Sequence, residues 1–243
     1  PSLFGMFRKG YAYSMKNIPI KNKEILGALN NFLWYYDNRD TIVAKNLQLH
    51  GKAENRSHFC GNEYRDKIVK MDEKHDGYPE DTHSYSLKAD RLHHMGMEMD
   101  EDRSRASAAA FIERYGKYND ELCTLLCTRN NALTTMYPPN GYISWHNNAN
   151  ASAYNLIFTW SETGDGCFKY IDGHTGNEVV VQDVKGWQCK AGYFGAYGEP
   201  WYNRVYHAAE TDCWRITVSY IFDRSDMALN LQDEIIEEIM FDY

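Results

Sequence analysis

The chain has 243 residues, of which 43% are hydrophobic, 14% aromatic and 25% charged, which is typical of a globular protein and excludes collagen-like, coiled-coil and wholly disordered chains. No apolar stretch reaches the roughly 18 residues that a membrane-spanning helix needs, and the start lacks a signal-peptide pattern, so we expect a soluble intracellular protein without membrane contact. The net charge is −8, but residues 223–243 hold seven acidic and one basic side chains, and the rest is nearly balanced. We therefore expect no clear surface for nucleic acid, which needs clustered lysine and arginine.

Two amphipathic helices are predicted in the first half of the chain. Residues 22–36 and 106–127 each place large apolar side chains at intervals of three and four, which gives one apolar stripe along a helix. We expect both helices to brace one face of a sheet. The intervening residues 51–105 are rich in charge, histidine and methionine, and they show no apolar periodicity. They predict either one long irregular excursion or a set of short elements near the functional site.

A sheet is predicted in residues 137–222, which hold 9 of the 17 glycines and 5 of the 6 tryptophans. Short alternating or β-branched runs follow one another there, separated by glycine-rich turn signals and by no helical stretch. This pattern is typical of an antiparallel sandwich or barrel and not of alternating β-α units. The predicted strands are Tyr142–Trp145, Tyr154–Trp160, Cys167–Ile171, Glu178–Gln182, Gln188–Phe194, Arg204–His207 and Cys213–Phe222.

A third helix is predicted at about residues 228–240, with a leucine and three isoleucines on one stripe between acidic positions. This stripe packs either on its own domain or on a protein partner. The chain is thus divided into a helical and irregular support region (residues 1–130), a sheet core (131–225) and an acidic C-terminal helix (226–243). We expect the three parts to form one structural domain.

The six cysteines lack the spacing of a disulfide-stapled domain, so we expect free thiols. Cys123 and Cys127 share one face of the second predicted helix, where two small core side chains are a simpler interpretation than a metal site. His58 and Cys60, together with either His50 or His75, are an alternative set for zinc.

The candidate functional residues lie in one motif and at two later positions. Tyr137 is followed by His146 and Asn148 in the segment Tyr-Pro-Pro-Asn-Gly-Tyr-Ile-Ser-Trp-His-Asn-Asn, and His207 and Arg215 come far downstream. This pattern resembles the iron(II)- and 2-oxoglutarate-dependent oxygenases. The resemblance is to the prolyl-hydroxylase-like branch, in the form encoded by tailed phages that infect marine bacteria.

The resemblance covers roughly residues 130–225 and implies a mainly β fold with supporting helices (α+β), in which a double-stranded β-helix (jelly roll) core carries N-terminal helices and a C-terminal helix. It also implies iron(II) as cofactor and 2-oxoglutarate as cosubstrate, which together with dioxygen hydroxylate a polypeptide or a small-molecule substrate. The implied metal and catalytic positions are His146, Asn148 and His207, and the implied cosubstrate positions are Arg215, Tyr137, Thr217 and Ser219.

The geometry of strands is compatible with these roles. Residues 146 and 148 of one strand point to the same side, so both can face one barrel mouth. His207 can approach on another strand, and three protein ligands leave the open positions that iron(II) needs for a cosubstrate and dioxygen. Arg215 offers a planar fork for a carboxylate, and polar and apolar residues alternate after it, which predicts a strand with one polar face.

Asn148 departs from the family pattern, which has Asp or Glu at this position. Asn148 can ligate a metal through its amide oxygen, it can leave the position open to water or a halide, or the site has lost catalysis. The hypothesis is therefore a hydroxylase, and its alternative is a catalytically inactive jelly-roll module with a structural or interaction role. A phage-encoded protein would reside in the host cytoplasm or the virion. A third possibility is a cupin-like binder of a sugar or metabolite without metal dependence.

Overall fold

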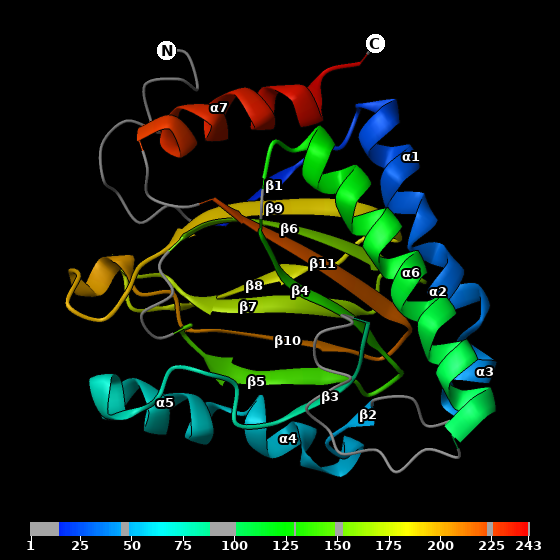
Figure 1. Ribbon diagram of the computed structural model, residues 1–243. Coiled ribbons are helices and arrows are strands. Elements are labelled where there is room, and N and C mark those ends of the chain that lie inside the picture. Colours follow the sequence, from blue (N-terminus) through cyan, green and yellow to red (C-terminus); the bar gives the residue numbers. More distant parts are fainter. Residues whose placement is uncertain are drawn as a thin grey trace.

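The computed structural model describes residues 15–44, 49–87, 101–128, 130–148, 153–222 and 226–242. Within these ranges, eleven strands join into one mostly antiparallel sheet that curls into a half-barrel (Figure 1). In the same ranges, no helix has the length and apolar character to cross a membrane. The strands are β1 (Lys16–Ile18), β2 (Leu49–His50), β3 (Thr82–Ser86), β4 (Asn130–Tyr137), β5 (Tyr142–His146), β6 (Ala153–Ser161), β7 (Gly166–Ile171), β8 (Glu178–Gln182), β9 (Gly186–Phe194), β10 (His207–Thr211) and β11 (Arg215–Phe222).

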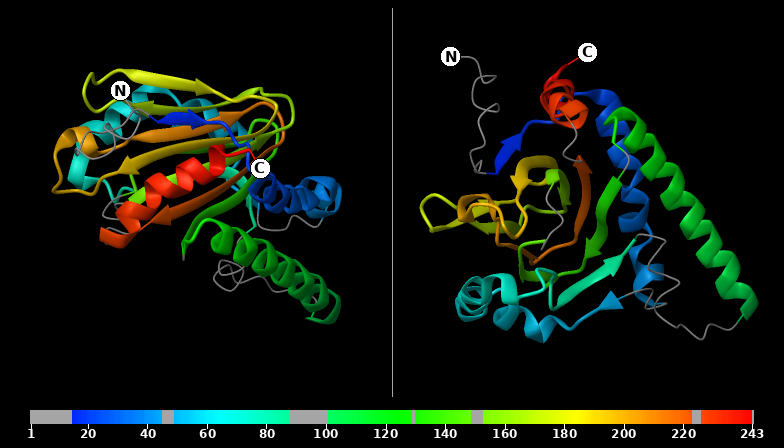
Figure 2. Two further views of the ribbon diagram at one scale, coloured as in Figure 1. Left: turned by 90° about the horizontal axis from the view of Figure 1, so that it is seen from above. Right: turned by 60° about the vertical axis from the view of Figure 1, so that its left-hand side comes forward.

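Two walls of strands enclose the interior of the half-barrel (Figure 2). The major wall has the order β1-β9-β6-β11-β4 and the minor wall has the order β5-β10-β7-β8, and β3 joins them by pairing with both β4 and β5. From β4 onward the chain alternates between the walls, except that β7 and β8 are neighbours in the minor wall. The predicted antiparallel arrangement is therefore confirmed.

Helices cover the outer faces of both walls. The helices α1 and α6 run side by side outside the major wall, whereas α4 and α5 pack against β5 (Figure 1). The helices are α1 (Lys23–Asn31), α2 (Leu33–Asp37), α3 (Arg39–Ala44), α4 (Arg56–Phe59), α5 (Asn62–Met71), α6 (Glu101–Leu125) and α7 (Asp226–Met240), with 3-10 turns at Ala53–Asn55, Asp72–Lys74 and Trp201–Asn203.

The side chain of Asn22 fixes the start of the first predicted helix. Its Oδ1 atom accepts hydrogen bonds from the backbone N–H groups of Glu24 and Ile25 and so satisfies two donors that the helix leaves unpaired. The predicted helix over residues 22–36 is interrupted at Phe32, which ends α1 and precedes α2. Phe32 is fully buried in the core between the helices and the major wall.

Alternation along the strands of the major wall separates this core from the interior of the half-barrel. On β11, Ile216 and Val218 point outward into the core beneath the helices. Arg215 and Thr217 have the opposite parity and point inward. The predicted polar face of this strand is therefore the inner face. The major wall consequently combines an apolar outside with a polar inside.

Several elements differ from the sequence-based expectations. The predicted strand at residues 204–207 is wrong, because a 3-10 turn precedes this segment and β10 begins only at its last residue, His207. Strand β4 extends upstream of the predicted sheet region and was not among the predicted strands. As far as residue 87, the segment 51–105 consists of short elements, and residues 88–100 lie outside the described ranges.

The C-terminal helix α7 packs on its own domain. Its residues Ile235, Ile236 and Ile239 are buried in the same core as α1 and the major wall. The backbone N–H groups of Lys21 and Asn22 donate to the Ile239 carbonyl, at 2.9 and 3.1 Å, and tie the end of α7 to the start of α1. A protein partner that binds this helix would therefore have to contact its acidic face.

Candidate functional site

One cavity of about 330 Å³ lies inside the half-barrel, between the two walls. This volume is at the lower end of the range of about 300–1,000 Å³ that is usual for small-molecule sites. The structure brings all seven candidate residues from the sequence to the wall of this cavity. They are Tyr137, His146, Asn148, His207, Arg215, Thr217 and Ser219.

Two histidines from adjacent strands face each other at the cavity. His146 ends β5, His207 begins β10, and the two residues are paired directly across the antiparallel ladder. Their ring centroids are 4.1 Å apart. Because the register of the two strands fixes this pairing, the sheet itself holds the imidazoles together although they are far apart in sequence.

Each imidazole is anchored by a backbone carbonyl two residues before it. The Nδ1 atom of His146 is 2.7 Å from the Ser144 oxygen, and the Nδ1 atom of His207 is 2.8 Å from the Val205 oxygen. A carbonyl oxygen only accepts, so Nδ1 must carry the proton and donate it. In a neutral ring this leaves the lone pair on Nε2, which is how most metal-ligating histidines are oriented.

Burial keeps both rings neutral. Desolvation lowers the pKa of His146 to about 4, against the opposing effect of its hydrogen bond to the Ser144 carbonyl. Desolvation also lowers the pKa of His207 well below its usual value, and the neighbouring His146 acts in the same direction. Phe168 and Phe194 pack on the His207 ring, with ring centroids 5.6 and 4.7 Å away, and limit its contact with water. The pair is thus ready to coordinate a cation without first losing protons.

Asn148 lies beside the pair but not on the same strand as His146. Strand β5 ends at His146, and Asn148 follows in a left-handed backbone conformation with φ 65°, which asparagine tolerates better than most residues. The expectation that residues 146 and 148 share one strand face is therefore wrong, although the side chain of Asn148 still borders the cavity. A positive φ, and not strand alternation, brings it there.

The histidine pair fits a divalent metal as two nitrogen donors, but among the described residues that line the cavity no carboxylate completes the set. In the described part of the chain, no group of three or more His, Cys, Asp or Glu side chains could hold a metal. The alternative zinc set around His58 and Cys60 is therefore not assembled, and Cys60 is instead close to the carbonyls of Ile143 and Ala209. All six cysteines are free thiols, as expected. A further protein donor at the cavity is the neutral amide of Asn148.

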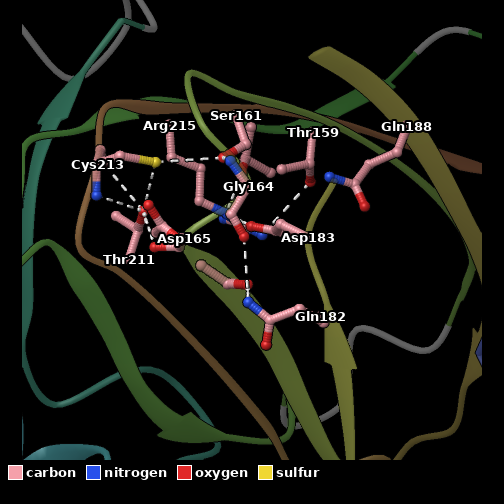
Figure 3. Close-up of polar contacts among 12 residues, drawn as sticks. Thr159, Ser161, Gly164, Asp165, Gln182, Asp183, Gln188, Thr211, Cys213 and Arg215 are labelled. Carbon is pink, nitrogen blue, oxygen red and sulfur yellow. Dashed lines mark hydrogen bonds and ion pairs between the residues drawn. The ribbon is translucent and has the colours of Figure 1, made fainter. Parts of the chain in front are cut away.

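Arg215 places a buried guanidinium in the cavity wall. Its side chain is only 2% exposed, its Nη1 donates to the Thr217 hydroxyl at 2.8 Å, and its Nη2 donates to the Thr159 hydroxyl at 3.4 Å. Its Nε donates to Asp183 at 2.7 Å (Figure 3). A guanidinium has five N–H donors, so two remain on the terminal nitrogens after these three bonds. Arg215 can therefore still bind a carboxylate.

Two further hydroxyl groups, those of Tyr137 and Ser219, border the cavity. Among the described residues, neither Tyr137 nor Ser219 has a hydrogen-bond partner for its hydroxyl, and both side chains are more than nine-tenths buried. Burial raises the pKa of Tyr137 to about 12, so its hydroxyl remains protonated and can donate. Tyr137 and Ser219 are thus available to a polar ligand in the cavity.

A tight turn positions Tyr137 relative to β5. Asn140 has φ 64°, and Gly141 donates its N–H to the Pro138 carbonyl at 2.8 Å. A Cβ atom at Gly141 would lie 2.6 Å from that carbonyl oxygen and 2.7 Å from the Tyr137 Cβ, so only glycine fits. The sequence Pro-Pro-Asn-Gly therefore serves to bring β4 and β5 to neighbouring positions at the cavity.

Asp183 and Lys190 were not predicted from the sequence as residues of the site. Asp183 directly follows β8 and Lys190 lies within β9, and both side chains are fully buried in an ion pair of 3.2 Å. The sequence signal that could have revealed Lys190 is the alternation of side chains along β9. Lys190 shares the inward face of this strand with Gln188 and Phe194. A lysine on the inner face of a predicted barrel strand calls for a buried anion nearby, and Asp183 is that anion.

No known protein family model matches the chain, and no curated protein sequence is similar to it. Among solved structures, the fold is similar to the crystal structure of a Pseudomonas putida prolyl-4-hydroxylase, with a TM-score of 0.42 and 11% sequence identity. The match covers 92% of this chain and 100% of that chain. A similarity of this strength assigns neither a family nor an activity, which must be inferred from the cavity.

Proposed function

We propose that the protein is an iron(II)- and 2-oxoglutarate-dependent oxygenase. The observation that carries the proposal is the combination, in one cavity, of two neutral histidines paired across strands with a buried arginine. The histidines supply nitrogen donors for a metal, and Arg215 supplies a cation for a ligand carboxylate. A 2-oxo acid with a second carboxylate can bind the metal through its 2-oxo acid end and Arg215 through its other carboxylate.

The strand order supports a double-stranded β-helix as the core. Four strands of the major wall, β9-β6-β11-β4, oppose four strands of the minor wall, β5-β10-β7-β8, and consecutive strands alternate between the walls except at β7 and β8. This order is compatible with an eight-stranded jelly roll built from two antiparallel sheets. The histidines belong to the minor wall and Arg215 belongs to the major wall, so a ligand that spans the cavity contacts both.

In this proposal each residue has a definite task. His146 and His207 hold iron(II) through Nε2, with the amide oxygen of Asn148 as a third and weaker donor. When bound, iron(II) supplies the activation of dioxygen that the hydroxylation of a C–H bond requires. Arg215 binds the distal carboxylate of 2-oxoglutarate, and the hydroxyls of Tyr137 and Ser219 donate to it.

The nearly balanced charge of the body favours a polypeptide or a small molecule as substrate. A second candidate function is a jelly-roll module without catalysis, which the amide of Asn148 favours, because a neutral donor binds a cation less tightly than a carboxylate does. The two candidates differ in one measurable property: the oxygenase forms a ternary complex with iron(II) and 2-oxoglutarate, and the module does not.

Anaerobic titration with iron(II) and 2-oxoglutarate tests the proposal. Chelation of the 2-oxo acid by bound iron(II) gives a weak visible charge-transfer band, which we expect for the wild-type protein. His207→Ala should abolish the band, whereas His58→Ala, which alters an exposed histidine on α4, should retain it. Absence of the band in the folded wild-type protein at millimolar iron and cosubstrate would overturn the proposal in favour of the inactive module.

A further inference from the structure

Arg215, Asp183 and Lys190 form one buried cluster, which we call the charge triad. The two carboxylate oxygens of Asp183 accept from Arg215 Nε at 2.7 Å and from Lys190 Nζ at 3.2 Å. The Lys190 ammonium also donates to the amide oxygen of Gln188 at 3.1 Å. All three charged side chains are at most 2% exposed (Figure 3 shows Arg215 and Asp183).

The triad holds two cations but only one anion. Among the described residues, Asp183 is the only acidic side chain that is ion-paired with Arg215 or Lys190. A buried charge is costly unless an opposite charge balances it, and an ion pair that served stability alone would need only one cation for one anion. With all three groups ionised, the triad carries one uncompensated positive charge.

The triad meets the cavity through only one of its members. Arg215 borders the cavity, whereas Asp183 and Lys190 are not among the residues that line it. Asp183 holds the Nε edge of the guanidinium, and the threonines beside it hold one N–H of each terminal nitrogen, so the guanidinium cannot rotate. One N–H donor remains on each of its two terminal nitrogens.

We propose that Asp183 and Lys190 determine which ligand the Arg215 end of the cavity accepts, namely an end group with a single negative charge. Asp183 is a positioning residue that orients Arg215 but cancels its charge, and Lys190 restores the positive charge that Asp183 cancels. The inference rests on the proposed function for the identity of the ligand but not on metal binding. Without Lys190, Arg215 would keep its geometry and lose its attraction for a carboxylate.

Variants that change the net charge of the triad test this inference. Lys190→Met removes one positive charge and keeps a side chain of similar length, whereas Asp183→Asn/Lys190→Met returns the net charge to that of the wild type. Lys169→Met is the matched control, because Lys169 is also nine-tenths buried but forms its ion pair with Glu210, outside the charge triad. Circular dichroism establishes that each variant is folded before binding is measured.

The probe is glutarate, a dicarboxylate without the 2-oxo group that chelates a metal, and its binding to the metal-free protein is measured by isothermal titration calorimetry. We expect Lys190→Met to weaken binding by about 30-fold, as a unit charge within about 8 Å does at an effective dielectric constant of about 20. The double variant should recover to within about threefold of the wild type, and Lys169→Met should bind as the wild type does.

A purely structural role of Lys190 gives the opposite order, because the double variant would then bind no better than Lys190→Met. That result, or unchanged binding in Lys190→Met, overturns the inference. The outcomes that refute the proposed function differ from those that refute this inference. If the glutarate affinities follow the predicted order but no charge-transfer band forms with iron(II), the anion site stands and the oxygenase does not. If the band forms but the wild-type protein binds no glutarate, the inference fails alone.

Discussion

Neutralising Asp183 should destabilise the protein far more than neutralising an exposed aspartate. The Asp183 carboxylate is fully buried, and Asp183→Asn leaves the two cations that it contacts, Arg215 and Lys190, without their anion. Removing one partner of a buried ion pair costs about 3–5 kcal/mol. That cost is a large fraction of the roughly 5–15 kcal/mol by which a typical domain is stable.

The matched control is Asp212→Asn. Asp212 also forms an ion pair, with Arg56, but its side chain is 63% exposed. An exposed pair contributes about 0–1 kcal/mol, because water and salt screen it. Adding Lys190→Met to Asp183→Asn should recover part of the loss, since one of the two unpaired cations is then removed.

Urea denaturation followed by circular dichroism and tryptophan fluorescence measures these differences. Comparable m-values among the variants are required, because a changed slope indicates a changed denatured or native state. If Asp183→Asn costs no more than Asp212→Asn, or if Lys190→Met adds to the loss instead of reducing it, the account of the charge triad is wrong.

Three further predictions follow from the same structure. Asn148→Asp should tighten the binding of manganese(II), measured anaerobically by calorimetry, by about tenfold or more, since an anionic donor replaces a neutral one; unchanged affinity would show that residue 148 does not face the metal. Ile239→Ala should lower the free energy of unfolding by about 2–4 kcal/mol, because this fully buried side chain joins α7 to the core. Glu237→Ala, at an exposed position of the same helix, should change the free energy of unfolding by less than about 0.5 kcal/mol. Arg215 and Lys190 hold the pKa of Asp183 below its usual value, although burial alone would raise it. The ionised Asp183 therefore stabilises the folded protein fully above about pH 4, and this stabilisation is lost as the pH falls through the folded-state pKa. The unfolding free energy of the wild type should decrease more steeply below about pH 4 than that of Asp183→Asn, and parallel curves would contradict this prediction.

Local patterns predicted most of the strands and one polar strand face, but they did not predict the arrangement that assembles the site. Alternation after Arg215 was sufficient to place Thr217 on the same strand face as Arg215, and the structure shows that this face lines the cavity. The pairing of His146 with His207 depends on the register between two strands that are distant in sequence, which periodicity does not encode. It was anticipated only through the resemblance to a known family.

The wrong sequence-based predictions have local physical causes. The segment before His207 is rich in aromatic and β-branched residues, yet a 3-10 turn at Trp201–Asn203 delays the start of β10. Asn148 was assigned to the strand of His146 because alternation was extended past the strand end, where the backbone adopts a positive φ. Asp183 was overlooked because an aspartate after a strand is usually a turn residue in solvent, and only the tertiary fold brings Arg215 and Lys190 to it.

The most direct test of the central claim is a crystal structure with manganese(II), a stand-in for iron(II) that resists oxidation, and 2-oxoglutarate. The account predicts anomalous density for one metal bound by the Nε2 atoms of His146 and His207, and a 2-oxoglutarate molecule whose distal carboxylate contacts Arg215. A cavity that binds neither under these conditions, or a metal bound elsewhere in the chain, would contradict the account.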